Sequence, residues 1–276
     1  YNISLSKSSG TNTFYSSVNL VDNKSSSIGN QSQYIRFLLK NTTQLFPGIR
    51  FSTSVSGLFS KGVSNGVSAY DFMTQIPYEM FTDTDGNYLP RNICIPGFSL
   101  ARNKELMGMG YYDWSTNLKQ DMDNKDNNTT IFSPRINLGL NIKIIEGLTF
   151  DSKFQYELNS SKSDYFYNEN TQTVRHLVNV YTIIRNGEPV YQIPRGPIYD
   201  FSESSQNSWY VRNQLTFVRS FGDGKHKINA IAGTEVNSSK YKYKSDRYHN
   251  YNKEKLTYTL IDEDTYSRSL ATYNGG

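Results

Sequence analysis

Several residue types and patterns are nearly missing from this sequence of 276 residues. Its single cysteine, Cys94, excludes an internal disulfide framework and a cysteine-based metal cluster. No run of about 18 apolar residues occurs, which excludes a transmembrane helix. The 29 Lys and Arg residues nearly balance the 25 Asp and Glu residues and are spread along the chain, without the basic stripe of nucleic-acid-binding proteins. We therefore expect no nucleic-acid partner.

Helical periodicity and targeting signals are also scarce. The best helix candidate is SAYDFMTQIP (68–77), a short piece that we expect inside a loop. The chain begins with Tyr1, carries no signal peptide and ends on SLATYNGG. These features lead us to expect part of a longer protein, or a processed chain.

Signatures of catalysis and of metal binding are missing as well. The three histidines have no metal-ligand spacing, and the sequence has no Gly-x-Ser-x-Gly elbow. The segment DMDNKDNN (121–128) begins like a calcium loop, but Lys125 takes a ligand position and Asp126 stands where the loop needs glycine. We expect no enzyme activity, no cofactor and no metal site.

Aromatic residues, in contrast, are abundant. They make up 14% of the chain, with 22 tyrosines, although the mean hydropathy is −0.62. A disordered chain is poor in aromatic residues. Many polar residues together with many aromatic ones indicate strands with one wet face and one apolar face.

Alternation of apolar and polar residues, nearly complete, shows this most clearly in LTFDSKFQYELNSSK (148–162). About eight segments of this kind occur, each near or above the ~9–11 residues that a tilted strand needs to cross a bilayer. One face of the quoted segment, which we expect to contact lipid, carries Leu148, Phe150, Phe154, Tyr156 and Leu158.

Connections between these segments alternate between short and long. The short ones, such as QLFPGI and FGDGK, carry the Gly, Pro and Asp residues of tight turns. The long ones are expected at 22–32, 61–130 and 161–204, with a further loop after residue 238. Outer-membrane barrels have short periplasmic turns and long extracellular loops. We therefore predict an all-β fold, an antiparallel transmembrane β-barrel, here a partial barrel of about eight long strands in which residues 1–276 belong to one barrel domain.

Two sets of residues are candidates for function. Hydrocarbon requires every backbone group to be paired, so the sheet has to close around a polar lumen. We expect the lumen to be lined by Arg50, Asn141, Lys143, Asp151, Lys153, Gln155 and Glu157. Aromatic residues expected in the long loops are candidates for contact with a ligand or a capping partner, and the alternative is that they pack within the loops. They are Tyr111, Tyr112, Trp114, Tyr165 and Tyr167.

The order and spacing of these segments resemble the barrel strands of SusC/RagA-type TonB-dependent transporters of the Bacteroidetes outer membrane. The segments that carry the resemblance are YNISLSKSSGTNTFYSSVNLVDN, IRFSTSVSGLFS, FTDTDGNYLP, INLGLNIKIIEGLTFDSKFQYE and WYVRNQLTFVRSFGDGKHKINAIAGTEV. The resemblance runs with gaps from residue 1 to about residue 240. Segment 100–130 lacks the Asn-Pro step that is frequent in the family, and the tail after 240 matches only as loop.

The resemblance implies import of oligosaccharides or peptides across the cell outer membrane of a Gram-negative bacterium. It also implies partners: a SusD-like surface lipoprotein, the TonB complex acting through a plug and TonB box that this chain lacks, the glycan or peptide substrate, and outer-membrane lipid. A different interpretation is a soluble β-rich carbohydrate-binding or adhesin module. That interpretation predicts that the apolar faces of the strands pack against each other.

Overall fold

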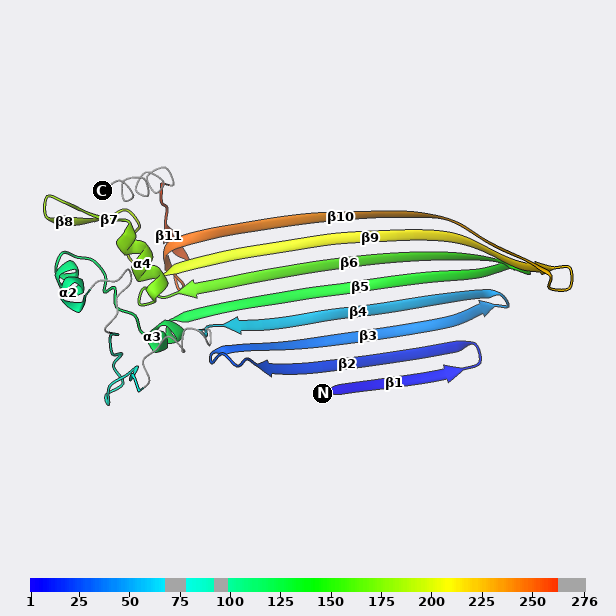
Figure 1. Cartoon of the computed structure of the whole chain (residues 1–276), viewed down its shortest axis with the longest axis horizontal. Coiled ribbons are helices and arrows are strands. Elements are labelled where there is room, and N and C mark those ends of the chain that lie inside the picture. The colour runs from blue at the N-terminus through cyan, green and yellow to red at the C-terminus, as the bar shows by residue number, and fades with distance from the viewer. Residues whose placement is uncertain (68–77, 92–98, 263–276) are drawn as a thin grey trace.

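A long antiparallel sheet makes up most of the molecule (Figure 1). The computed structural model describes residues 1–67, 78–91 and 99–262. The strands of the sheet are β1 (Asn2–Ser9), β2 (Asn12–Lys24), β3 (Asn30–Phe46), β4 (Ile49–Ser64), β5 (Lys125–Ile145), β6 (Leu148–Tyr167), β9 (Ile198–Phe221), β10 (His226–Asn252) and β11 (Thr257–Thr259). Each pairs with the next along the chain. The all-β, antiparallel prediction is confirmed, with eight long strands and the short β11, and the sheet does not close on itself.

The alternating pattern of the sequence fixes the register of the sheet. Phe154 of β6 lies opposite Leu138 of β5 and Val211 of β9. Residues directly opposite each other in neighbouring strands share a face. A slip of one residue would move every one of these side chains to the other face, so two faces of different character specify one register.

Tight turns join the strands at one end of the sheet, and the longer connections lie at the other end (Figure 1). The turn between β5 and β6 depends on Gly147, whose φ of +82° is unfavourable for other residues. A Cβ atom at Gly147 would also lie 2.5 Å from the carbonyl oxygen of Val218. The predicted asymmetry of short and long connections is confirmed.

The predicted loop bounds were too wide, because the strands extend further than the alternation does. The connection after β4 covers 65–124, and the one after β6 covers 168–197. Strand β10 continues to Asn252, so the loop expected after residue 238 is wrong. The strand ends near the loops carry polar residues on both faces, as in SSKYKYKSDRY, and therefore show no apolar stripe.

The two long connections form a second structural region, which we call the loop layer. It contains α2 (Leu100–Gly108), α3 (Leu118–Asp123), α4 (Gln172–Val180) and the hairpin of β7 (Thr182–Arg185) and β8 (Glu188–Tyr191). Helix α4 starts at the capping side chain of Thr171 and buries Val174 and Val178, four residues apart. These valines pack with Tyr181, Ile193 and Ile198. The helix candidate at 68–77 and Cys94 lie outside the described residues.

Candidate functional site

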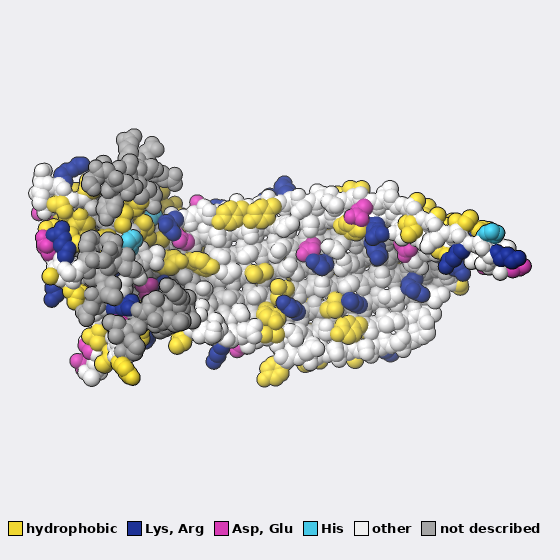
Figure 2. Space-filling view, in the orientation of Figure 1, with side chains coloured by type: hydrophobic (Ala, Val, Ile, Leu, Met, Phe, Trp, Pro, Cys, Tyr) yellow, Lys and Arg dark blue, Asp and Glu magenta, His cyan; other side chains and the backbone are white. Residues whose placement is uncertain are grey.

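Strand register gathers the predicted lumen residues on one face of the sheet, which we call the polar face. Arg50, Asn141 and Asp151 lie side by side in one row across β4, β5 and β6. The remaining predicted residues follow on the same face, Lys143 opposite Thr149, Lys153 opposite Gly139, Gln155 opposite Asn137 and Glu157 opposite Arg135. Figure 2 shows charged side chains of both signs scattered over this face among polar ones.

Several of these side chains bond directly to each other. The Nδ2 of Asn141 donates to Oδ1 of Asp151 at 2.6 Å. Arg135 donates to Oε2 of Glu157 from Nε at 3.0 Å and lies within 2.9 Å of it through Nη2. Gln155 donates to the same oxygen at 3.4 Å. The acids of this part of the face are therefore engaged by neighbouring donors.

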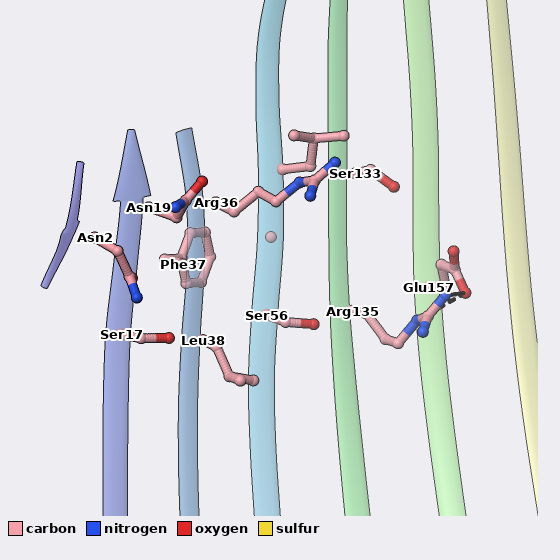
Figure 3. Close-up of a pocket in the computed structure, with 12 residues that line it drawn as sticks. Asn2, Ser17, Asn19, Arg36, Phe37, Leu38, Ser56, Ser133, Arg135 and Glu157 are labelled. Carbon is pink, nitrogen blue, oxygen red and sulfur yellow. Dashed lines mark hydrogen bonds and ion pairs between the residues drawn. The ribbon is translucent and has the colours of Figure 1, made fainter. Parts of the chain in front are cut away.

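Of the open hollows on the polar face, two lie around basic residues of β3, β5 and β6. The larger has a volume of about 540 Å³ and extends over β1 to β6. Figure 3 shows Arg36 reaching across β4 towards Ser133, while Arg135 turns to Glu157. The smaller, of about 260 Å³, lies between Lys40 of β3 and Lys153 of β6.

The opposite face, which we call the apolar face, carries a band of apolar side chains. In β4 and β5 the band runs from the pair Ile49–Ile142 to the pair Phe59–Phe132. These are ten residue steps, or about 33 Å along the strand at ~3.3 Å per residue. Phe59 and Phe132 are 48% and 46% exposed, so nothing in the described chain covers them. Past this pair the face becomes polar at Lys61 and Thr130.

Charge is confined to the edges of this band. Strands β2, β3, β4, β5, β6 and β9, all fully described, place no charged residue on it. Lys7 of edge strand β1 and Lys240 of β10 do lie on this face. Lysines are a common device on exposed strands at the edge of a sheet.

Several polar side chains inside the band are bonded to each other. Ser152 donates to Oδ1 of Asn213 at 2.8 Å. Near the turns, Asn12 donates to Thr43 at 3.0 Å and Thr43 donates to Asn41 at 2.7 Å. An unpaired polar group costs several kcal/mol in an apolar medium, about 4–8 kcal/mol in cyclohexane. For these residues, the bonds lower the cost of hydrocarbon surroundings.

Polar contacts lock the two long connections of the loop layer together. Asn179 accepts from the backbone N–H of Tyr112 at 2.7 Å and donates to its carbonyl at 2.9 Å. Arg175 of the same helix donates to the carbonyl of Asp113 at 2.8 Å. The backbone N–H of Gln172 donates to Asp121 at 2.5 Å. Helix α4 is thereby fixed to the preceding connection.

The Asp113 carboxylate is held in its charged form. Burial raises its pKa, but hydrogen bonds from Asn103 and Ser115 and the positive charge of Arg175 outweigh that effect, so the pKa lies below its ordinary value. Asn103 donates to Oδ1 at 2.7 Å. Burial lowers the pKa of Arg175, while Asp113 and Asp121 act against it.

The predicted loop aromatics fall into two groups. Trp114 is buried in the loop layer with its ring 5.3 Å from that of His176. The hydroxyl of Tyr111 donates to the carbonyl of Thr182, and that of Tyr112 donates to Glu169, both at 3.2 Å. These three residues are therefore engaged within the loop layer, and their contact with a ligand stays a prediction.

Tyr165 and Tyr167 belong to strand β6, so their placement in a loop was wrong. The period-two pattern of β6 loses its apolar stripe after Leu158, which hid the end of the strand. Tyr167 packs against the core of the loop layer. Tyr165 lies opposite Asp200 on the polar face. A role in ligand contact stays a prediction for both.

Sequence reasoning missed an ion pair on the polar face near the loop layer. Arg247 of β10 donates to both carboxylate oxygens of Asp200, each at 2.6 Å. Both residues stood in segments that we expected to be loops. The absence of Gly and Pro between Lys240 and Asn252 was the available signal that the strand continues.

The calcium-like segment 121–128 does not form one loop. Asp121 lies in α3 and pairs with Lys125 at 3.1 Å. Asp126 lies in β5 and pairs with Lys253 at 2.7 Å. Within the described ranges, no three His, Cys, Asp or Glu residues are grouped so as to hold a metal ion.

Among the residues that the structure describes, no helix is long and apolar enough to cross a membrane.

Comparison with known proteins gives similarity in fold alone. No family model matches the sequence, and no curated protein matches it. The fold is similar to a chain of the RagAB peptide transporter, with a TM-score of 0.66, 11% identity, and coverage of 95% of this chain and 26% of that one. The fold is also similar to a chain of the RagAB peptide importer in its open-open state, with a TM-score of 0.67 and 12% identity. That match covers 93% of this chain and 26% of the other. For the closed-closed state of that importer the TM-score is 0.61 and the identity 11%, and the match covers 90% of this chain and 28% of the other. The chain spans about a quarter of the length of these structures.

Proposed function

We propose that this chain forms part of the wall of a larger outer-membrane β-barrel that imports peptides or oligosaccharides. The observation that carries the proposal is the uncovered apolar band between Ile49–Ile142 and Phe59–Phe132. Its ten residue steps match the ~9–11 residues of a tilted strand that crosses a bilayer. Outer-membrane barrels carry an apolar band about 25 Å tall, which strands of about 33 Å reach when tilted by ~40°.

The open sheet supports a barrel built with further strands. Strand β1 has one partner, β2, and β10 is followed only by the three-residue β11. Backbone groups at an open sheet edge are not tolerated in hydrocarbon. The structures of similar fold are about four times as long as this chain, which leaves room for the missing strands.

Transport is the activity that best fits these surfaces. The polar face would line the lumen, and the structures of similar fold are chains of a peptide transporter. By the resemblance of the sequence, import would be energised through TonB and assisted by a SusD-like lipoprotein on the loop side. We propose no catalytic role and no cofactor for the chain.

The soluble binding module finds no support in the described residues. That interpretation predicts a second layer packed on the apolar face. In the part of the chain that the structure describes, no second layer packs on this face of the nine-stranded sheet, and the only other sheet is the hairpin of β7 and β8.

Uptake by cells that carry the complete gene tests the proposal. We expect labelled peptides or oligosaccharides to enter cells with the gene, and uptake to stop in a strain without TonB or after an uncoupler removes the proton-motive force. We also expect the protein to fractionate with the outer membrane. A reading frame that closes near these residues, and a product that folds in water without detergent, would contradict the proposal.

A further inference from the structure

Basic side chains gather on the polar face around the two hollows. We call Arg36, Lys40, Arg135 and Lys153 the basic strip. Arg36 and Lys40 lie four residues apart on β3, about 13 Å along the strand. Arg135 lies on β5 and Lys153 on β6, three strands from Lys40, or about 14 Å across the sheet at ~4.8 Å per strand.

Most of the charge in this strip is not neutralised. Arg135 pairs with Glu157 at 2.9 Å. Among the described residues, no carboxylate lies within ion-pair distance of Arg36, Lys40 or Lys153. No acid lines the smaller hollow between the two lysines. An anion that entered this hollow would therefore meet positive charge without competition from the protein's own acids.

Small side chains leave the space between the lysines open. Ser52 and Ser54 of β4 and Asn137 of β5 line the smaller hollow with hydrogen-bonding groups. Gly139 lies between them, and a Cβ atom there would come 2.4 Å from Oγ of Ser52. Any side chain at Gly139 would fill the floor of the hollow.

Resting on the function proposed above, we propose that the transporter selects acidic peptides, whose carboxylates bind along the basic strip. Lysine and carboxylate form charge-assisted hydrogen bonds, which are stronger than those between neutral groups. Among the described side chains that line the two hollows from the polar face, Tyr210 is the only aromatic one. Within the two hollows, a sugar ring therefore finds one aromatic surface for stacking, which favours a peptide over an oligosaccharide there.

Binding and uptake by the complete transporter test this inference. The variant is Lys40→Gln with Lys153→Gln, and the probes are a peptide rich in Asp and Glu and its counterpart with Asn and Gln of equal length. Lys225→Gln with Lys227→Gln, at the exposed β9–β10 turn and the start of β10, removes the same charge far from the strip. Lys40→Arg with Lys153→Arg keeps the charge and controls for folding. Affinity is measured by calorimetry on the purified protein, and uptake is measured in cells.

We expect the Lys40→Gln, Lys153→Gln variant to bind the acidic peptide about tenfold or more weakly, since a hydrogen bond to a charged group contributes about 1.5–3 kcal/mol. The neutral peptide should bind within about twofold of the unaltered protein, and both control variants should retain acidic-peptide binding. Equal losses for both peptides, or no loss for either, would overturn the inference. A loss seen only with a sulfated or uronic-acid oligosaccharide would overturn it as well. Failure of the unaltered transporter to import any peptide or oligosaccharide would instead refute the underlying transport function.

Discussion

The sheet and the loop layer bury their apolar side chains in different ways. In the loop layer, other side chains of the same chain bury Val174 and Val178 fully and leave Ile193 1% exposed. In the sheet, apolar residues such as Phe59 and Ile136 remain 48% and 40% exposed although they follow a strict alternating pattern. The loop layer thus has a core of its own, whereas no described part of the chain covers the apolar face of the sheet.

On the proposed function, the two regions are built for different surroundings, the loop layer for water and the apolar face of the sheet for lipid. The loop layer is held by a compact apolar cluster and by polar contacts such as that of Asn179 with Tyr112. The sheet is held by its backbone ladder, and within its apolar band some polar groups pair with one another, as Ser152 does with Asn213. Each region can therefore be perturbed separately.

The largest effect is expected in the core of the loop layer. Ile193→Ala removes a side chain that is fully enclosed, so the free energy of opening of this region should fall by about 2–5 kcal/mol. Hydrogen exchange of the amides of α4 measures this free energy of opening. The control is Ile184→Ala, at a position that is 40% exposed. Equal effects of the two substitutions would contradict the separate core.

A charge on the apolar face should be almost as costly, although the position is exposed in the chain. Phe154 is 38% exposed, yet Phe154→Arg should destabilise the protein in lipid by about 2–4 kcal/mol, because the charge would face the bilayer midplane. Gln155→Arg, one residue along on the polar face, should have little effect. Unfolding of the complete protein from lipid vesicles measures both, and a similar cost for both would argue against lipid on one face.

Acid should weaken the loop layer through Asp113. Its pKa lies below the ordinary value in the folded state, so its contribution is fully present above the unfolded pKa of about 3.9 and is lost as the pH falls towards the folded pKa. Hydrogen exchange of α4 as a function of pH should therefore show faster opening below about pH 4. Asp113→Asn should flatten that pH dependence, and an unchanged profile in this variant would assign the effect to other groups.

The smallest effect is expected for the ion pair on the polar face. Arg135 and Glu157 are partly exposed, with 47% and 24% of their side-chain surface accessible. A double-mutant cycle with Arg135→Gln and Glu157→Gln should give a coupling of about 1 kcal/mol or less. A larger coupling would mean that the polar face is shielded from water.

The sheet was predictable from the sequence because its signal is local. In residues 148–158 the apolar and polar positions alternate, and tight-turn residues such as Gly147 mark where the chain reverses. The seven predicted polar residues share one face because this period of two persists through neighbouring strands. The strand ends beyond Leu158 were missed because both faces there are polar.

The loop layer was not predictable in the same way. Asn179 and Tyr112 lie 67 positions apart, and their contact involves polar groups that no periodicity marks. Helix α4 is too short to show three turns of apolar residues. Trp114 therefore appeared as a candidate for ligand contact, whereas the structure places it in the interior of this region.

The central claim, that the apolar face contacts lipid, is tested most directly by nitroxide labels in the complete protein in lipid vesicles. On a Cys94→Ser background, each position from 150 to 158 is replaced in turn by cysteine and labelled. Collisions with oxygen, which concentrates in hydrocarbon, and with a water-soluble nickel chelate are then measured. We expect a period of two, with oxygen favoured at 150, 154, 156 and 158 and nickel favoured at 151, 153, 155 and 157. Nickel access at both sets, or no access of either reagent at the first set, would contradict it.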